Sequence, residues 1–191
     1  MGPGVYNQQE RKALLELARS SISNAVLSNN VKLADPNTLS ENLKTERACF
    51  VTLTIHGNLR GCIGSLEAYQ PLYQDVQLRA IQAALDDSRF QPLSKQELGQ
   101  VKIEISVLTE PALLEYDTPD QLPTLLRPHI DGVILQDGNR RATFLPQVWQ
   151  QLPNKEDFLA RLCQKMGASA DHWKTKLLQV FTYQVEEFSE H

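Results

Sequence analysis

Residues 49–64 carry the pattern that most restricts the fold of this chain of 191 residues. Apolar and hydroxyl side chains alternate through residues 49–55, as in a strand with one buried face. His56-Gly57-Asn58 is a turn signal, and residues 59–64 then run back as a second strand. The segment therefore predicts a β-hairpin with one face against a core.

One register of this hairpin places every apolar side chain on the same side. The predicted cross-strand pairs are Val51 with Ile63, Leu53 with Gly61, and Ile55 with Leu59. This register implies a three-residue loop, which a glycine accommodates. It puts Cys62 opposite Thr52 and Arg60 opposite Thr54, and both pairs then lie on the face away from the core.

Periodicity along the rest of the chain predicts further helices and strands. Helical spacing and capping residues indicate helices at 8–28, 70–85, 118–126, 146–152 and 155–166, with single turns at 94–97 and after 171. Alternation indicates a strand at 101–108, a second hairpin at 132–135 and 140–144, and a closing strand at 178–186. Because this order is not a repeat of strand and helix, we predict an α+β fold with a mainly antiparallel or mixed sheet and flanking helices.

The composition argues against several classes of protein. A net charge of -4 and a pI of about 5.6 do not suit a nucleic-acid-binding protein, which needs a basic surface. No apolar run approaches the ~20 residues of a membrane span, so we expect no membrane partner. Three cysteines without a C-x-x-C pair indicate reduced thiols and a cytoplasmic location. No histidine pair has metal-ligand spacing, and we expect neither a metal nor a cofactor.

Cys62 is the leading chemical candidate because it lies between two glycines and close to an arginine. A nearby guanidinium favours the thiolate, which serves as a nucleophile, a redox centre or a ligand to a soft metal. The alternative is a small residue packed at a strand end, where cysteine behaves as a small hydrophobe. A Cys–His pair is not expected, because His56 lies at the far tip of the hairpin.

Glu104 and two arginines are further candidates. Glu104 lies within an apolar strand, on the face opposite Ile103 and Ile105, and it would share a face with Arg60 and Cys62 if that strand neighbours the first hairpin. The three groups would then bind a substrate or carry out acid–base chemistry. An exposed Arg–Glu pair on a solvated sheet face is an equal alternative. Arg140 and Arg141 begin a strand and point to opposite faces, so that one can bind an anion while the other is structural.

The segment Asp86-Asp87-Ser88-Arg89-Phe90 follows a predicted helix. Acidic groups are unfavourable at a helix C-terminus, which indicates a specific contact for them. We favour a structural explanation, in which side-chain-to-backbone hydrogen bonds fix the loop and Phe90 docks into the core.

Five sequence blocks in a fixed order resemble the AMMECR-one domain family, whose prokaryotic members are called AmmeMemoRadiSam system protein A. The blocks are Leu59–Ser65 with its R-G-C-I-G motif, Asp86–Leu93, Ile103–Leu108, Asp131–Leu135 and Arg140–Trp149. The resemblance runs from about residue 10 to residue 188. It implies a compact α+β protein with a main and a smaller subdomain, which we delimit as one AMMECR-one-like domain at residues 8–188 after an N-terminal tail at residues 1–7.

The resemblance also implies partners and a site, although no defined reaction. Members of the family are associated in genomes with a Memo-like protein of the dioxygenase fold and with a radical SAM protein. The site usually proposed for the family is a cleft around the R-G-C-I-G segment. Here that segment is Arg60, Gly61, Cys62, Ile63 and Gly64. Ser65 stands where threonine is common in the family, and it keeps the hydroxyl.

Two functions from different classes remain open. We predict a binding or adaptor component that acts with the Memo-like and radical SAM proteins through a cleft around Cys62. The alternative is an enzyme or redox protein that uses Cys62 and Glu104 on a small anionic substrate. Its substrate-binding residues would be Arg60, Gly61, Ile63, Gly64 and Arg141. The sequence favours binding because it offers no obvious base beside the thiol, and it leaves open whether the chain is an enzyme.

Overall fold

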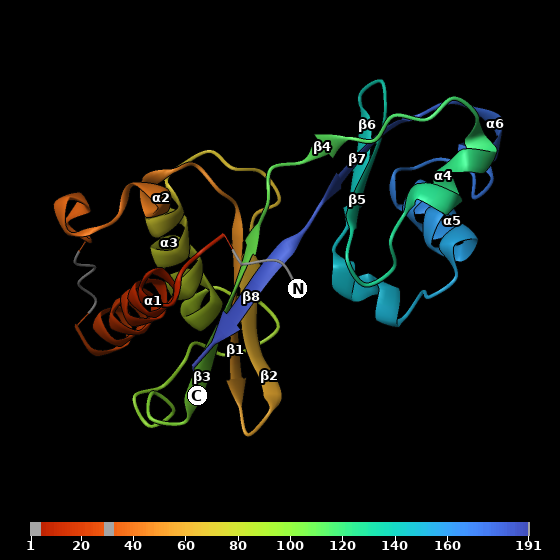
Figure 1. Cartoon of the computed structure of the whole chain (residues 1–191). Coiled ribbons are helices and arrows are strands. Elements are labelled where there is room, and N and C mark those ends of the chain that lie inside the picture. The colour runs from red at the N-terminus through yellow and green to blue at the C-terminus, as the bar shows by residue number, and fades with distance from the viewer. Residues whose placement is uncertain (1–4, 29–32, 191) are drawn as a thin grey trace. The chain divides into compact units, whose positions relative to one another are not determined.

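The computed structural model describes residues 5–28 and 33–190, which form two compact units. The first unit takes the chain up to Leu108 and again from Glu186, and the second unit is Thr109–Val185 (Figure 1). Each unit combines a four-stranded sheet with helices, so the fold is α+β, as predicted. Residues 1–4 of the predicted N-terminal tail lie outside the described residues.

The first unit has helices on one face of its sheet. Its elements are α1 (Gln8–Ser28), η1 (Pro36–Thr38), α2 (Glu41–Lys44), β1 (Cys49–Ile55), β2 (Asn58–Gly64), α3 (Leu72–Leu85), β3 (Val101–Leu108) and β8 (Val185–Ser189). The strand order is β2-β1-β3-β8, and β1 is antiparallel to both β2 and β3. Helices α1 and α3 pack against each other and against this sheet (Figure 1). The predicted helix at 8–28 and the predicted strand at 101–108 are confirmed.

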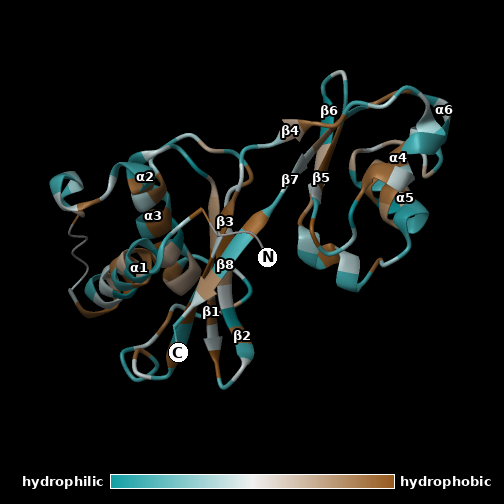
Figure 2. Ribbon diagram, viewed as in Figure 1, coloured by the Kyte–Doolittle hydropathy of each residue, from teal (hydrophilic) through white to brown (hydrophobic). Residues whose placement is uncertain are grey.

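Strand alternation decides which face of the first sheet meets the helices. Val51 and Leu53 of β1 and Ile103 and Ile105 of β3 are fully buried in the core of this unit. Each such side chain contributes about 1.5–3 kcal/mol when it leaves water. Figure 2 shows apolar residues on α3 and in the strands of this sheet. The residues between these positions point to the other face, away from the helices.

The middle of the β1–β2 hairpin has the predicted register. The confirmed cross-strand pairs are Val51 with Ile63, Thr52 with Cys62, and Leu53 with Gly61. A slip of one residue would turn Val51 and Leu53 out of the core, so burial specifies this register strongly.

The tip of the hairpin differs from the prediction. His56 and Gly57 both have positive φ, and they form a two-residue turn in place of the expected three-residue loop. The pairs next to this turn are Ile55 with Asn58 and Thr54 with Leu59. The predicted pairing of Arg60 with Thr54 is therefore wrong, because Arg60 is the extra residue of a β-bulge. Leu59 was expected to face the core and is instead exposed.

The second unit is built around its own sheet, with the strand order β4-β7-β5-β6. Its elements are β4 (Ala112–Leu113), η2 (Pro119–Gln121), α4 (Leu122–Leu125), β5 (Gly132–Asp137), β6 (Arg140–Phe144), η3 (Pro146–Gln150), α5 (Lys155–Lys165), α6 (His172–Thr175) and β7 (Gln179–Tyr183). Trp149 and Phe158 stack in its core with ring centroids 3.6 Å apart. Asn154 caps α5 by accepting the backbone N–H groups of Glu156 and Asp157.

The predicted closing strand at 178–186 is divided in the structure. β7 belongs to the sheet of the second unit and β8 to the sheet of the first. The division falls at Gln184, whose carbonyl accepts the Thr109 N–H at 2.8 Å and whose N–H donates to the Thr109 hydroxyl at 2.8 Å. The prediction of one strand was wrong because two successive strands share the same period of two, so that alternation alone does not show the break.

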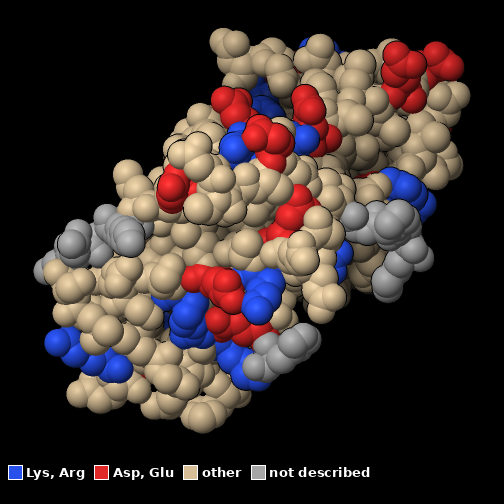
Figure 3. Space-filling view, turned by 60° about the vertical axis from the view of Figure 1, so that its left-hand side comes forward, with Lys and Arg blue, Asp and Glu red and all other residues tan. Residues whose placement is uncertain are grey.

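The surface carries charges of both signs. On the face shown in Figure 3, basic and acidic side chains form mixed groups. Ion pairs of the described residues include Arg11 with Glu186 at 2.9 Å and Lys44 with Glu41 at 2.8 Å. Within residues 5–28 and 33–190, no helix has both the length and the apolar character that crossing a membrane requires.

Candidate functional site

Three polar side chains lie in a row across neighbouring strands of the first sheet. Thr52 of β1 pairs with Cys62 of β2 on one side and with Glu104 of β3 on the other. Because cross-strand partners share a face, all three point away from α1 and α3. The Thr52 hydroxyl donates a hydrogen bond to Cys62 Sγ at 3.2 Å. We call these three residues the Cys62 row. Their pairing confirms the prediction that Glu104 and Cys62 share a face.

The two ends of the Cys62 row are separated by one strand. Neighbouring strands lie about 4.8 Å apart, so the backbones at Cys62 and Glu104 are about 10 Å apart. Direct proton transfer needs heavy atoms within about 3 Å of each other. Glu104 and Cys62 can therefore contact the same ligand, and among the described residues the side-chain hydrogen bond of Cys62 Sγ is to Thr52 and not to Glu104.

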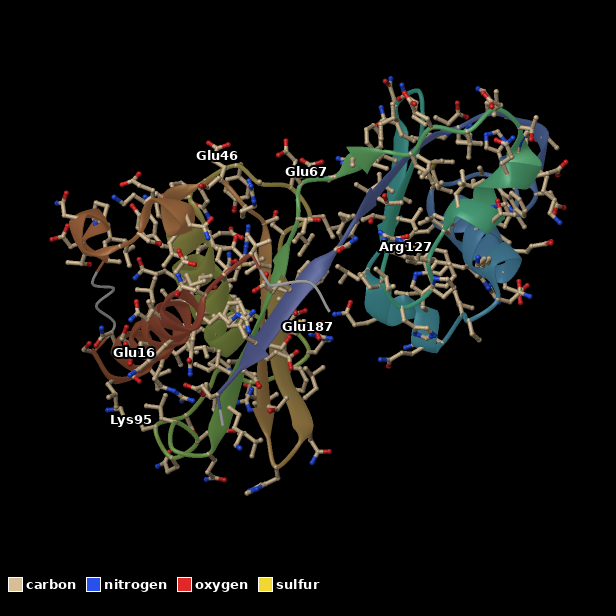
Figure 4. All side chains as sticks on the ribbon, in the orientation of Figure 1. Glu16, Glu46, Glu67, Lys95, Arg127 and Glu187 are labelled. Atoms are coloured by element: carbon tan, nitrogen blue, oxygen red, sulfur yellow. The ribbon has the colours of Figure 1, made fainter. Side chains whose placement is uncertain are left out.

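Glu104 is a half-buried carboxyl group whose environment favours its neutral form. Burial raises its pKa, and the negative charge of Glu187 on β8 raises that pKa further. Figure 4 labels Glu187 on this strand, which neighbours β3 in the sheet. A carboxyl group with a raised pKa exchanges protons more readily near neutral pH than an ordinary one. Glu104 can thus exchange a proton with a ligand bound on this face.

The backbone of Cys62 is held by two side chains from the segment after α3. Strand β2 is at the edge of the sheet, and the Cys62 N–H donates to Asp87 Oδ2 at 2.9 Å. Arg89 Nη2 donates to the Cys62 carbonyl oxygen at 3.2 Å. The hydrogen bonds from the Arg89 side chain hold the pKa of the buried Asp87 carboxyl well below its usual range. Together these side chains take the place of a neighbouring strand at Cys62.

The structure confirms one part of the explanation given for residues 86–90 and revises another. The Arg89 N–H donates to Asp87 Oδ1 at 3.1 Å, which is the expected side-chain-to-backbone bond. Phe90 is only partly buried, and guanidinium groups lie over its ring, that of Arg60 at 5.9 Å and that of Arg89 at 5.5 Å. The contact of this segment with Cys62 was not predicted, because it joins side chains to the backbone of a distant strand.

Arg60 binds Glu97, the last residue of the predicted single helical turn at 94–97. Its Nε donates to Glu97 Oε1 at 2.7 Å and its Nη2 to Glu97 Oε2 at 3.2 Å. Nη2 also donates to the Gln91 carbonyl at 2.9 Å. The Arg60 guanidinium lowers the pKa of Glu97 to about 2, with help from the Ser94 N–H. Arg60 therefore ties β2 to the 91–97 loop.

The two glycines of the R-G-C-I-G motif are required by close packing. A Cβ at Gly61 would lie 2.1 Å from the Ala83 carbonyl oxygen of α3. A Cβ at Gly64 would lie 2.3 Å from the ring of Phe50. Neither position has room for a side chain. Ile63 packs partly against the core of the first unit, so steric fit accounts for all three residues without a ligand.

Arg141 belongs to the second unit, whereas the Cys62 row belongs to the first. It lies on β6 opposite Gln136 and is exposed. Its role in binding a substrate stays a prediction. Across residues 5–28 and 33–190, the His, Cys, Asp and Glu side chains form no group of three or more that could hold a metal ion.

Comparison with known proteins links the chain to one family. A sequence model described as AMMECR1 matches residues 15–188. A protein from Methanothermobacter thermautotrophicus is 37% identical over 186 residues, covering 96% of each chain. A protein from Thermofilum pendens is 33% identical, covering 98% of this chain and 92% of that protein. The crystal structure of an uncharacterised protein from Pyrococcus horikoshii matches with a TM-score of 0.81 and 31% identity, covering 97% of this chain and 93% of that chain.

Proposed function

Because this chain belongs to the AMMECR1 family, we propose that it is a binding or adaptor protein that acts with a Memo-like protein and a radical SAM protein. The partners are taken from the family resemblance of the five sequence blocks. The surface assigned to this binding is the Cys62 row with the neighbouring Asp87 and Arg89, and a cleft there stays a prediction. The observation that carries the proposal is the way in which the first unit fixes Cys62.

Cys62 is held through both its backbone and its side chain. Asp87 and Arg89 bind its backbone N–H and carbonyl groups, and Thr52 donates to its sulfur. The preceding residue, Gly61, is packed closely against α3. A surface that is fixed before binding loses little conformational entropy when a partner docks, which favours affinity.

The same contacts give the thiol little chemical activation. A nucleophilic cysteine needs a nearby base or cation that favours the thiolate. The donor to Cys62 Sγ is the neutral hydroxyl of Thr52, and the two nearby guanidinium groups, those of Arg60 and Arg89, are engaged by Glu97 and Asp87. Thr52 stands between Glu104 and Cys62 in the row, and the hydrogen bond of Cys62 Sγ is to Thr52 and not to Glu104. The geometry therefore supports binding better than nucleophilic catalysis.

A charge reversal on the Cys62 row tests the binding proposal. Calorimetric titration of the Memo-like and radical SAM proteins from the same organism into Glu104→Arg should show at least about tenfold weaker binding, because a buried contact would meet a misplaced charge. Glu16→Arg is the matched control, because it makes the same charge reversal at an exposed position on α1 (Figure 4). Failure of both partners to bind the unmodified protein, or equal binding by the two variants, would count against the proposal.

One observation favours the alternative of an enzyme or redox protein that uses Cys62 on a small anionic substrate. Glu104 has a raised pKa and faces the same side as the thiol, so a substrate lying along the row would touch both groups. Alkylation of the native protein tests this, because Cys49 and Cys163 are buried. An enzyme should show a Cys62 reaction rate that titrates clearly below pH ~8.5, whereas an ordinary profile supports the binding function.

We also propose a cytoplasmic location. All three cysteines are free thiols, as expected in a reducing compartment. Mass spectrometry of protein alkylated immediately on cell lysis should find Cys62 reduced, and a disulfide on most copies would contradict this location.

A further inference from the structure

A cluster of cationic side chains surrounds one carboxylate in the second unit. Asp137 is the last residue of β5, and its two oxygens accept bonds from three side chains. The distances are 2.5 Å from Arg140 Nη2 to Oδ2, 2.7 Å from Lys176 Nζ to Oδ1, and 2.9 Å from His172 Nε2 to Oδ2. We call these four residues the Asp137 cluster.

Local backbone geometry brings the members of the Asp137 cluster together. The turn between β5 and β6 has two residues, and Gly138 adopts positive φ, so that Asp137 pairs directly with Arg140. His172 is the first residue of α6 and Lys176 directly follows this helix. The four side chains thus come from two separate parts of the second unit and meet at one carboxylate.

The Asp137 cluster has an excess of positive charge in an acidic protein. Arg140 and Lys176 are cations, and Asp137 is the anion that they share. Protonation of His172 adds a further positive charge beside them. The chain as a whole has a formal net charge of -4, so this positive excess runs against the general balance.

Several hydrogen-bond donors of the cluster remain available to a ligand. The side chains of Arg140 and Lys176 are 45% and 55% exposed. Lys176 has three N–H donors and directs one of them to Asp137. Arg140 Nη1 makes only a long bond of 3.4 Å to the Gly167 carbonyl. An incoming anion can therefore bind both cations without displacing Asp137.

We propose that the Asp137 cluster is a binding site for a small oxyanion of the phosphate class. Guanidinium and ammonium groups are the usual protein partners of such anions. Asp137 holds the three nitrogen-bearing side chains together and does not itself contact the ligand. Its negative charge opposes the anion, so we expect a Kd on the order of 1 mM. This binding is independent of the function proposed for the Cys62 row.

Titration of the whole protein with sodium sulfate, followed by amide chemical shifts in NMR, tests the site. Signals of residues 137–140 and 172–176 should move and saturate, whereas sodium chloride at the same ionic strength should not reproduce the change. Arg140→Gln and Lys176→Gln should each weaken binding about tenfold. Lys174→Gln is the matched control, because Lys174 bonds to Glu156 of α5 instead of Asp137.

The dependence on pH gives a second readout. Sulfate stays a dianion between about pH 8 and about pH 5.5, so a rise in sulfate affinity as the pH falls across this range would come from protonation of the protein, and His172 is the member of the cluster whose side chain can gain a proton. His172→Gln should remove the rise. The charged groups within this cluster are Asp137, Arg140 and Lys176. Asp171, the residue before His172, is also charged, and its negative charge adds to the larger effect of Glu156 in raising the pKa of the nearby Lys174.

Three results would overturn the proposal. One is a set of sulfate shifts that sodium chloride reproduces, which would indicate general screening of charge. Another is an equal loss of affinity in Lys174→Gln. The third is an unchanged affinity in both Arg140→Gln and Lys176→Gln with thermal unfolding as in the unmodified protein.

Discussion

Asp87 in the first unit and Asp137 in the second are both carboxylates surrounded by donors, and both have a pKa held below its ordinary range. The largest cause is the Arg89 side chain for Asp87 and the Lys176 side chain for Asp137. The two sites differ in whether the hydrogen-bond donors are backbone or side-chain groups. Asp87 also accepts the backbone N–H of Cys62, whereas the bonds that lower the pKa of Asp137 come from side chains.

This difference distinguishes a carboxylate that stabilises the fold from one that positions cations for a ligand. Asp87 is buried and completes the hydrogen bonding of a sheet edge, so its loss would leave a backbone group without a partner. The cations around Asp137 are about half exposed and can add a partner without any backbone change. The same ion-pair chemistry therefore stabilises the first unit and leaves the second unit able to bind an anion.

The largest effect is expected from Asp87→Ala. It removes the acceptor of the Cys62 N–H and the partner of Arg89, so the free energy of unfolding of the first unit should fall by about 3 kcal/mol. Hydrogen exchange of the β1 and β2 amides measures this unit, because both tryptophans lie in the second unit. Asp86→Ala is the control at an exposed neighbour and should cost less than about 0.5 kcal/mol. Similar losses in the two variants would contradict the structural role of Asp87.

Gly61→Ala should have the next largest effect. The added Cβ would meet the Ala83 carbonyl oxygen, so α3 and β2 must move apart, at a cost of about 2 kcal/mol. Gly99→Ala is the matched control, since a Cβ there meets nothing within 4 Å. Urea unfolding followed by circular dichroism compares the two. A Gly61→Ala protein as stable as the control would show that the close packing under Cys62 is not needed.

Acid should weaken the first unit through Glu97, whose pKa is lowered to about 2 by Arg60. A carboxylate with a folded-state pKa below its ordinary value of 4.5 adds stability above pH 4.5 and loses it as the pH falls towards 2. Because the Glu97 side chain is 28% exposed, screening limits this contribution to about 1 kcal/mol. Glu97→Gln should therefore lose less stability than the unmodified protein between about pH 6 and about pH 3. An identical loss of stability in the two proteins would show that Glu97 does not contribute to the pH dependence.

The smallest effect on stability is expected from Asp137→Asn. The cations around Asp137 are exposed to water, so the unfolding temperature should stay the same within error. Sulfate affinity should increase, because the variant loses the one negative charge that opposes the anion. Tryptophan fluorescence follows the unfolding of the second unit, and the NMR titration follows the binding. A large fall in unfolding temperature would make Asp137 structural, like Asp87.

Local patterns in the sequence were sufficient for most elements and for half of the hairpin. Helix α1 and strand β3 were predicted correctly because their apolar periods are long and uninterrupted. The register at Val51 and Leu53 followed from burial. The two-residue turn at His56 and Gly57 could not be predicted in the same way, because the neighbouring residues do not indicate that a histidine adopts positive φ.

The contacts that build the candidate site lie beyond the reach of local patterns. Ser94 and Glu97 matched a helix cap, and the Ser94 N–H does bond to Glu97 Oε2 at 2.8 Å. The following residues form turns and no helix, and Glu97 is also the partner of Arg60, 37 residues earlier in the chain. Such a pairing depends on the tertiary fold, so only the shared face of Glu104 and Cys62 could be predicted from strand alternation.

The division of the closing strand into β7 and β8 makes the second unit an insertion. The chain leaves the first unit after β3 and returns in β8, its neighbour in the sheet, and Thr109 and Gln184 are joined by hydrogen bonds at this crossing. A tight turn in place of residues 109–184 would join β3 to β8 and keep all four strands of the first sheet. Conversely, residues 109–185 begin and end side by side, as a cassette that can be grafted into another hairpin or closed into a ring.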